Sequence, residues 1–367
     1  MSLKVEDYGG GYKIVSIACD DETRADLLTN EDLEFIYVSE GKAVLLPESR
    51  EIKINNIEEA QNMNNYDVCE IWPDGRIYRY YDACSIDNYF FVTGKCNSNC
   101  IMCPSADYSR KNGNTANIGD LIEIAKHIPS DAAHLTITGG EPFVAGEAIF
   151  DFIDFLKCKF EETEILILTN GRAFAIDSFY NKLIDTIPNN CIIGVPIHGS
   201  TAELHDYITQ AKGSFNQTCT GLKRLIKHGI RIEIRIVVSA INLTDITDIA
   251  NLIVSEMPGV SYISIMAMEM TGSAYVNKER LWINYGDAFT ATIDAIKILL
   301  NAGIDVKLYN FPLCAVKKEY WTLCEKSISP DKVKYSSSCD LCSMKSACGG
   351  VFSGTYMLEN KELKPII

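Results

Sequence analysis

Three cysteines stand close together at Cys96, Cys100 and Cys103, in the spacing Cys-x3-Cys-x2-Cys. Thiolates are soft ligands that suit iron–sulfur clusters and zinc. Three of them in one short loop can hold three corners of a cubane cluster, which leaves the fourth iron without a protein ligand. An open position of this kind on a metal is where a substrate or cofactor can bind. An apolar run at residues 89–93 precedes the loop and predicts a buried strand.

Strand-like and helix-like segments alternate around this loop. Apolar runs predict strands at residues 89–94, 133–138, 164–169, 191–197, 231–238, 260–267 and 304–309. An apolar period of 3.6 residues predicts helices at residues 118–128, 146–159, 175–187, 214–228, 243–257 and 285–302. Such alternation predicts a parallel sheet. In barrels built this way the chemistry lies at the carboxyl ends of the strands, where the cysteine loop is also expected.

The cysteine spacing and four later segments together resemble the radical S-adenosylmethionine (SAM) superfamily. Each of these segments closes a predicted strand, and they are residues 139–142, 169–171, 193–198 and 237–242. The resemblance implies an α/β fold with a partial (β/α)6 TIM-type barrel. It also implies a [4Fe-4S] cluster on the three cysteines, whose fourth iron binds SAM and whose electron cleaves SAM to a 5′-deoxyadenosyl radical.

Residues at the strand ends are implied by the same resemblance to bind SAM. The two glycines before Glu141 let the backbone approach a ligand, although Glu141 could also be an ordinary surface carboxylate. Asn170 and His198 have structural alternatives, because a Thr-Asn-Gly turn needs no ligand and a lone histidine is more often structural.

Arg235 lies within an otherwise apolar strand and needs a partner, for which SAM's carboxylate and Glu233 are the two candidates. Met102 stands where the superfamily usually has an aromatic residue, and its thioether can still pack on adenine. No catalytic side chain is predicted. The expected SAM-binding residues are Met102, Gly139, Gly140, Glu141, Pro142, Thr169, Asn170, His198, Arg235 and Val238.

Four further cysteines lie in the last part of the chain. Cys339, Cys342 and Cys348 have the spacing Cys-x2-Cys-x5-Cys before Gly-Gly, which is similar to the auxiliary-cluster segments of SPASM and twitch extensions in radical SAM proteins. With Cys314 as the fourth ligand, one complete second [4Fe-4S] cluster fits, and Cys324 is then a spare. A structural zinc ion bound by four cysteines is the alternative.

Segments between residues 89 and 353 are also similar to the C-type radical SAM maturases of the His-Xaa-Ser peptide-modification system. These segments are residues 96–104, 268–272, 281–283, 309–314, 327–329 and 348–350. The similarity implies a precursor peptide as substrate, a second radical SAM maturase as partner, and an electron donor such as flavodoxin or ferredoxin. Two alternatives stand beside it: a radical SAM enzyme acting on a small metabolite in cofactor biosynthesis, and a non-catalytic zinc-binding interaction protein.

Three regions follow from these patterns: a β-rich domain at residues 1–87, the radical SAM barrel at residues 88–310, and a cluster-binding extension at residues 311–367. Short apolar runs separated by turn signals predict the strands of the first region, at residues 12–17, 35–38, 43–46 and 76–80. The first region either completes the fold or docks a peptide by adding a strand, and the former is slightly favoured.

Composition limits the classes of partner. A net charge of −15 and a pI of about 4.9 disfavour nucleic-acid binding. No apolar run reaches the roughly 20 residues that span a bilayer, and the first residues lack the apolar core of a signal peptide. We therefore expect a cytoplasmic protein without membrane contact, in which clustered cysteines are metal ligands rather than disulfides. Seven of the fourteen cysteines are scattered and are expected to be buried apolar residues: Cys19, Cys69, Cys84, Cys158, Cys191, Cys219 and Cys324.

Overall fold

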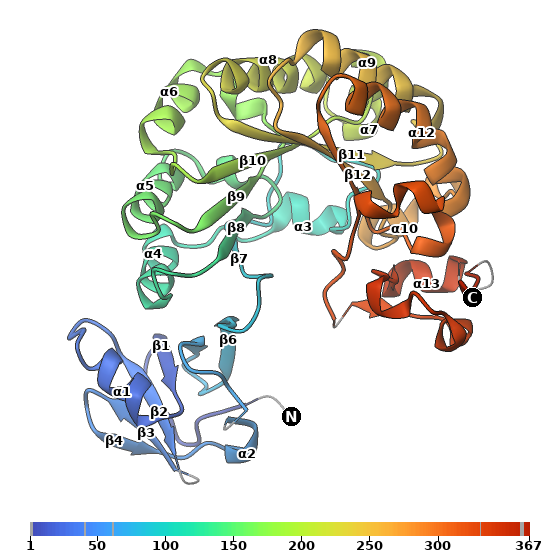
Figure 1. Cartoon of the computed structure of the whole chain (residues 1–367). Helices are drawn as coiled ribbons and strands as arrows, with labels where there is room; N and C mark the ends of the chain where they lie inside the picture. Colours follow the sequence, from blue (N-terminus) through green and yellow to red (C-terminus); the bar gives the residue numbers. More distant parts are fainter. Residues whose placement is uncertain (1–2, 40–41, 61, 331, 360–362) are drawn as a thin grey trace.

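A curved parallel sheet forms the centre of the molecule (Figure 1). The computed structural model describes residues 3–39, 42–60, 62–330, 332–359 and 363–367. In this part of the chain the sheet has eight strands in the order β14-β13-β12-β11-β10-β9-β8-β7, and all of its neighbouring pairs are parallel. Its strands are β7 (Tyr89–Phe91), β8 (His134–Thr138), β9 (Glu164–Leu168), β10 (Cys191–Pro196), β11 (Arg231–Val238), β12 (Tyr262–Ala267), β13 (Asp305–Tyr309) and β14 (Cys324–Glu325).

Helices cover the convex side of this sheet (Figure 1). The six predicted helices are present, each slightly shorter than expected: α4 (Ile118–His127), α5 (Ile149–Lys159), α6 (Asp177–Thr186), α8 (Ser214–Lys227), α9 (Ile246–Glu256) and α12 (Tyr285–Asn301). The prediction of a parallel α/β partial barrel is therefore confirmed. Five helices of the barrel and the extension were not predicted: α3 (Asp107–Asn112), α7 (Ala202–Thr209), α10 (Gly272–Val276), α11 (Lys278–Leu281) and α13 (Ser353–Glu359). Short 3-10 turns are η1 (Pro142–Ala145), η2 (Arg172–Ala175), η3 (Leu243–Asp245), η4 (Leu313–Ala315), η5 (Lys318–Leu323), η6 (Ser337–Leu341) and η7 (Lys345–Ala347).

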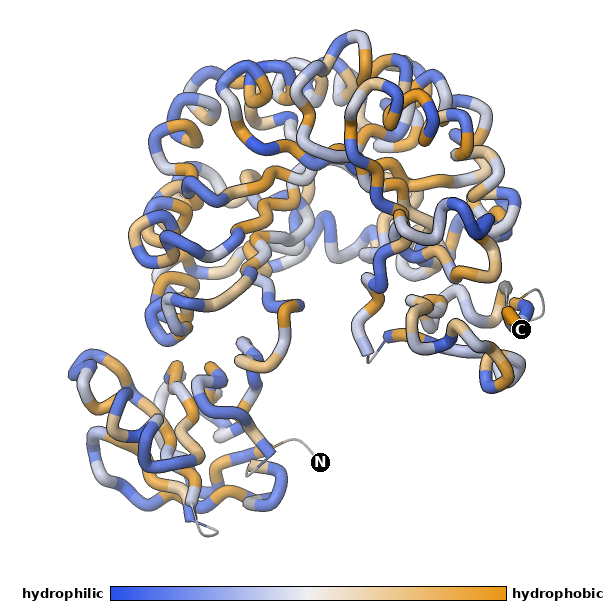
Figure 2. The backbone as a smooth tube through the Cα atoms, viewed as in Figure 1, coloured by the Kyte–Doolittle hydropathy of each residue, from blue (hydrophilic) through white to orange (hydrophobic). Residues whose placement is uncertain are grey.

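Strand β11 illustrates how the sheet separates core from interior. Side chains alternate between the two faces of a strand. The isoleucines at 232, 234 and 236 are fully buried in the main core between sheet and helices. Glu233 and Arg235 point the other way and line a cavity inside the barrel. Figure 2 shows apolar residues concentrated in the strands and recurring along the helices.

A second, separate sheet is formed near the N-terminus, in the order β4-β3-β2-β1-β5-β6. Its β1–β2 pair is parallel and the other pairs are antiparallel. Its elements are β1 (Lys13–Ala18), α1 (Asp21–Leu27), β2 (Phe35–Ser39), β3 (Lys42–Leu46), β4 (Arg50–Ile52), α2 (Ile57–Ala60), β5 (Val68–Ile71) and β6 (Ile77–Tyr81). The β-rich character of this region agrees with the prediction, although β4, β5 and both helices were not anticipated.

The N-terminal sheet packs directly on the barrel. Ile14, Val68 and Tyr81 belong to the main core of the barrel, while most of the sheet surrounds a core of its own. Ser16 Oγ and His127 Nδ1 form a buried hydrogen bond of 2.9 Å across the junction. Burial lowers the pKa of His127 to about 4, so this histidine is neutral at pH 7.

The last part of the chain folds against the end of the barrel. A two-stranded antiparallel ribbon forms from β15 (Val333–Lys334) and β16 (Val351–Phe352). Val351 and Leu363 are buried in the main core, so the extension is packed on the barrel. Trp321 Nε1–H donates to the carbonyl oxygens of Leu313 at 3.1 Å and Val316 at 2.9 Å. Among the described residues, no helix is long and apolar enough to span a membrane.

Candidate functional site

The loop with Cys96, Cys100 and Cys103 follows β7, as predicted for a carboxyl-end site. Two main-chain hydrogen bonds join it to the end of α7. The amide of Asn99 donates to Thr209 O at 2.9 Å, and the amide of Ile101 donates to Ile208 O at 3.0 Å. Helix α7 was not predicted, so the support of the loop depends on an element that the sequence pattern did not indicate.

The side chain of Arg110 holds the cysteine loop in place through hydrogen bonds. It is only 5% exposed, and a buried guanidinium needs partners. Its Nε and Nη2 atoms donate to Asn99 Oδ1 at 3.0 and 2.6 Å. Nη2 also donates to Ser273 Oγ at 2.9 Å, and Nη1 donates to Ser105 O. Sequence reasoning missed Arg110, because a single arginine in a polar segment carries no motif.

The three thiols of the loop lie within electrostatic reach of one another. Burial, together with the neighbouring Cys103 and Cys96, raises the pKa of the Cys100 thiol to about 12. Burial is also the main cause of the raised pKa of Cys96, whose sulfur accepts the Ser98 amide at 3.4 Å. A bound metal cluster reverses this balance, because its positive charge favours thiolates. The donor set therefore fits an iron–sulfur cluster.

The arrangement of possible ligands also bears on the zinc alternative. Among the described residues, no three His, Cys, Asp or Glu side chains are close enough together to hold one metal ion. A zinc ion draws all its ligands to a single centre. In a cubane each thiolate binds a different iron atom, which requires the sulfurs to lie farther apart. Three thiols, one for each of three iron atoms, are the donor set that a cubane with one open iron would require.

Gly139 and Gly140 hold the end of β8 against the cysteine loop. A Cβ atom on Gly139 would meet Thr93 O at 2.5 Å, and one on Gly140 would meet Lys95 O at 2.2 Å. The amide of Gly140 donates to Thr93 O at 2.6 Å. We expected the glycines to make room for a ligand. In the structure the room is taken by the backbone that leads into the cysteine loop.

Glu141 connects the ends of β8 and β9. Its side chain is buried, and its oxygens accept hydrogen bonds from Phe143 N at 3.2 Å, Thr169 Oγ1 at 2.8 Å and Asn170 N at 2.7 Å. Burial raises the pKa of this carboxyl, while these three donors lower it. A carboxylate has about four lone-pair sites, so one remains for a ligand. Glu141 is not the surface carboxylate of the alternative interpretation.

The segment after β9 is tied to the cysteine loop in turn. Asn170 Nδ2 donates to Asn97 Oδ1 at 2.6 Å. Arg172 Nη1 donates to Asn97 O at 2.6 Å and to Ser98 Oγ at 3.0 Å. The structure therefore brings together three of the predicted motifs: the cysteine loop, residues 139–142 and residues 169–170. Arg172 was not predicted to take part.

Three other predicted residues are buried in the protein. Met102 is 6% exposed and packs in a small apolar cluster with Met268 and Met270. Val238 is fully buried in the main core, so any contact of this residue with SAM would come from its main chain. Burial and the nearby His205 lower the pKa of His198 to about 3, and its Nδ1 atom has no hydrogen-bond partner in the described part of the chain.

Arg235 lies apart from the three joined motifs. It lines an open cavity of about 1520 Å³ inside the barrel, together with Glu233, Tyr262 and Lys307. Its Nε is 3.7 Å from Glu233 Oε1, which is one of the two partners expected for it. The described residues that line this cavity include none from the cysteine loop or from residues 139–142 and 169–170.

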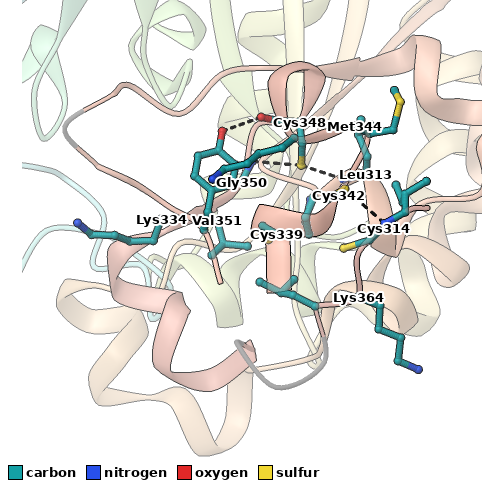
Figure 3. A pocket seen from close by; sticks show the side chains of 15 residues that line it. Leu313, Cys314, Lys334, Cys339, Cys342, Met344, Cys348, Gly350, Val351 and Lys364 are labelled. Atoms are coloured by element: carbon teal, nitrogen blue, oxygen red, sulfur yellow. Dashed lines mark hydrogen bonds between the residues drawn. The ribbon is translucent and has the colours of Figure 1, made fainter. Parts of the chain in front are cut away.

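The cysteines of the second group line a single cavity (Figure 3). Cys314, Cys339, Cys342 and Cys348 all line it, although they come from separate turns of the extension. Cys324 is not among the described residues that line this cavity. Cys314 thus shares the cavity with the three closely spaced cysteines, whereas Cys324 lies outside it, although burial and the nearby Cys348 thiol both raise the pKa of Cys324.

Main-chain amides point at the sulfurs of this second group. The sulfur of Cys348 accepts the amides of Leu313 and Gly350, both at 3.4 Å. The sulfur of Cys342 accepts the amide of Ile366 at 3.3 Å. Hydrogen bonds to the sulfurs are one of the factors that set the potential of iron–sulfur clusters. These donors, together with four thiols around one cavity, fit a cluster with four protein ligands.

Comparison with known proteins identifies the barrel. Residues 90–253 match the radical SAM superfamily. The chain is 32% identical over 163 residues to the antilisterial bacteriocin subtilosin biosynthesis protein AlbA of Bacillus subtilis, which covers 44% of this chain and 35% of AlbA. It is 27% identical over 177 residues to the AdoMet-dependent heme synthase of Methanosarcina barkeri, covering 47% of each. The chain therefore spans less than half the length of either relative.

Solved structures are more distant. The structure of anSMEcpe with bound AdoMet and Kp18Cys peptide has a TM-score of 0.48 and 15% identity, and the match covers 60% of this chain and 62% of that one. Streptococcus suis SuiB bound to S-adenosylmethionine has a TM-score of 0.46 and 12% identity, with 66% and 50% covered. The sequence match, the parallel barrel and the cysteine loop at its carboxyl end agree that residues 90–253 form a radical SAM domain.

Proposed function

We propose that the protein is a radical SAM enzyme that modifies a ribosomally made peptide. The observation that carries this proposal is the joining of the cysteine loop to residues 139–142 and 169–170 through the hydrogen bonds of Glu141 and Asn170. Three motifs far apart in sequence form one connected site at the carboxyl ends of adjacent strands. A site in a barrel is expected at this edge.

In this proposal Cys96, Cys100 and Cys103 hold a [4Fe-4S] cluster. A cluster held by these cysteines would supply the electron that cleaves SAM to methionine and a 5′-deoxyadenosyl radical, and this radical would take a hydrogen atom from the substrate. The protein's own part is to orient the groups and to exclude water. Glu141 offers its remaining lone pair to a cationic group such as the amino group of SAM. Asn170 and Arg172 hold the cysteine loop in place.

Cys314, Cys339, Cys342 and Cys348 would hold a second cluster. With four thiolate ligands it has no open iron, so we assign it to electron transfer or to support of the extension rather than to SAM binding. The electron donor is proposed to be a small redox protein such as flavodoxin or ferredoxin. A second radical SAM maturase is a proposed partner, from the similarity to the His-Xaa-Ser system.

A peptide substrate is supported by the similarity to AlbA, whose name describes the biosynthesis of a bacteriocin. The cavity inside the barrel is open to solvent, so a polypeptide segment could also enter it. We propose precursors with His-Xaa-Ser repeats as the first class to test. Mass spectrometry of such a peptide, incubated with enzyme, SAM and dithionite, would show a change of mass if this assignment is correct.

A small metabolite is the second candidate substrate. It is favoured by the similarity to a heme synthase and by the polar groups of Arg235, Glu233 and Lys307 inside the barrel. These groups could bind the carboxylates of a compact molecule. Substitution of Arg235 by Ala separates the two candidate substrates. It should abolish turnover of a carboxylate metabolite and only weaken turnover of a peptide.

The activity itself is tested by anaerobic reconstitution with iron and sulfide, followed by SAM and dithionite. We expect 5′-deoxyadenosine as a product. A reconstituted protein that contains iron and sulfide at both sites but makes no 5′-deoxyadenosine would contradict the proposal. Zinc at both sites, with no charge-transfer absorption, would instead support the non-catalytic interaction protein.

A further inference from the structure

A second open cavity lies between the N-terminal sheet and the first strand of the barrel, with a volume of about 820 Å³. It is separate from the cysteine sites. The residues that line it come from β5, β6, the connection after β6, and β7; they are Glu70, Tyr78, Arg79, Tyr80, Asp87, Asn88, Tyr89 and Phe91. It therefore lies beside an edge strand of the barrel, where a ligand could contact the main chain of that strand.

Strand β7 has a free edge in this cavity. It is the last strand of its sheet, and its hydrogen bonds to β8 show which of its main-chain groups point toward β8. The carbonyl of Asn88 accepts from Thr136 N at 3.0 Å, and the amide of Val92 donates to Thr138 O at 2.8 Å. Because alternate residues of a strand face the same neighbour, the main-chain groups of Tyr89 and Phe91 point away from β8.

Most of these main-chain groups are available to a partner. The amide of Phe91 lies beside the Tyr80 hydroxyl. Among the described residues, none pairs with the amide or carbonyl of Tyr89 or with the carbonyl of Phe91. An exposed edge with free donors and acceptors is a template for another extended chain.

Three aromatic side chains are exposed around this edge. Tyr78 is 61% exposed, Tyr89 51% and Phe91 47%. Tyr80, which also lines the cavity, packs against the buried Phe90 with ring centroids 5.9 Å apart, and this contact holds β6 beside β7. Exposed aromatic residues gathered in one concave place are typical of binding sites.

The charges in the cavity leave a negative balance. Arg79 is compensated by Asp67 at 3.1 Å and Asp82 at 3.0 Å. Glu70 accepts a hydrogen bond from the Tyr12 hydroxyl, which carries no charge at pH 7. Asp87 has no ion-pair partner among the described residues. The two carboxylates therefore favour a ligand with basic side chains.

We propose that this cavity docks an extended peptide segment with alternating basic and apolar side chains, which adds as a strand to the free edge of β7. The inference rests on the proposed function in taking this segment to be part of the substrate. Asp87 also lines the large cavity inside the barrel, so the two cavities adjoin. A peptide bound on β7 would be held at the entrance to the barrel interior.

The test measures binding alone, by fluorescence anisotropy of labelled synthetic decapeptides with the reconstituted protein and without SAM or reductant. The first probe alternates lysine with valine. The second alternates glutamate with valine, and the third is the lysine probe with N-methyl groups on alternate residues. We expect both altered probes to bind at least about tenfold more weakly than the first, because one loses the charge match and the other loses main-chain donors.

Two protein variants locate the site. Tyr89→Ala and Asp87→Asn change exposed residues outside both cysteine sites, and each should weaken binding of the lysine probe at least about fivefold. Leu300→Ala and Asp294→Asn are matched exposed changes on α12 and should leave binding unchanged. Equal binding of the lysine and N-methylated probes would overturn strand addition. Equal binding to the Tyr89→Ala variant and the parent protein would overturn the location.

The outcome is independent of whether the protein is an enzyme. If 5′-deoxyadenosine forms but the lysine probe does not bind, the docking site is wrong and the proposed function stands. If the probe binds at β7 and no 5′-deoxyadenosine forms, the docking site stands and the proposed function fails.

Discussion

The two cysteine groups of this protein differ in how they are assembled. Cys96, Cys100 and Cys103 lie in one loop, and the groups that hold the loop come from α3, α7 and the ends of β8 and β9. The second group takes Cys314 from the start of the extension, shortly after β13, and its other three cysteines from a segment more than 20 residues further along the chain. In the first group the cysteines are close together in sequence, and the residues that hold their loop come from other elements. In the second group the cysteines themselves are far apart in sequence.

This difference has a physical consequence. A cluster whose ligands join separate segments closes a loop of the chain, and its binding free energy then contributes to folding. A cluster bound within one short loop closes almost no chain. We therefore expect loss of the first cluster to remove activity and to spare the fold, whereas loss of the second should loosen the extension.

The largest effect is expected from replacing Cys96, Cys100 and Cys103 together by Ala. Formation of 5′-deoxyadenosine should fall to background, because no thiolate remains for the cluster, while far-UV circular dichroism stays unchanged. Cys158→Ala, an exposed cysteine on α5, is the matched control and should keep full activity. SAM cleavage by the triple variant would show that the first group is not the site of chemistry.

A smaller but distinct effect is expected from Cys342→Ala. Iron per chain should fall to roughly half, since one of two equal clusters is lost, and residues after Phe311 should become sensitive to protease. SAM cleavage without substrate should persist in part. Cys324→Ala should do none of this, because Cys324 does not line the cavity. If Cys324 proves necessary and Cys314 does not, our choice of ligands is wrong.

Glu141→Gln should show how far the first group depends on distant support. The amide keeps the shape of the carboxylate, but its NH2 group cannot accept the hydrogen bonds that Glu141 now accepts. We expect a loss of about 1–3 kcal/mol in the free energy of unfolding, measured with urea, together with weaker SAM binding. Glu147→Gln changes an exposed carboxylate nearby in sequence and should have little effect. Unchanged stability of Glu141→Gln would mean that these bonds do not hold the motifs together.

A smaller difference between the two cysteine groups is expected in their sensitivity to low pH. Burial lowers the pKa of His198 to about 3 and of His205 to about 4, from an ordinary value near 6.5. The unfolded chain therefore binds protons that the folded chain does not, and stability falls as pH drops from about 6.5 toward 4. Both histidines lie on elements beside the first group, and no described histidine lines the second cavity. Iron release to a chelator at pH 5 should come first from the first site, and simultaneous release from both would contradict this.

The sequence pattern was most informative where elements are long and regular. All seven predicted barrel strands and all six predicted helices are present. The helices have enough residues for their apolar period to be visible, and the strands are marked by apolar runs. Helices α3, α7, α10 and α11 were missed because each is too short for an apolar period of 3.6 residues to be visible. For α1 a signal was available: Asp20 caps the helix by accepting the Thr23 amide at 2.7 Å.

By itself the sequence determined the types and local spacing of the ligands, and the strand ends at which they lie. Only the tertiary structure decided which distant groups meet them: Arg110 and Arg172 at the cysteine loop, Cys314 at the second cavity, and Glu233 rather than the joined motifs beside Arg235. The physical reason is that spacing along the chain governs contacts within one loop or one strand. Contacts between elements depend on how the sheet curves and on which buried polar groups must find a partner, and neither is visible in a single residue's neighbours along the chain.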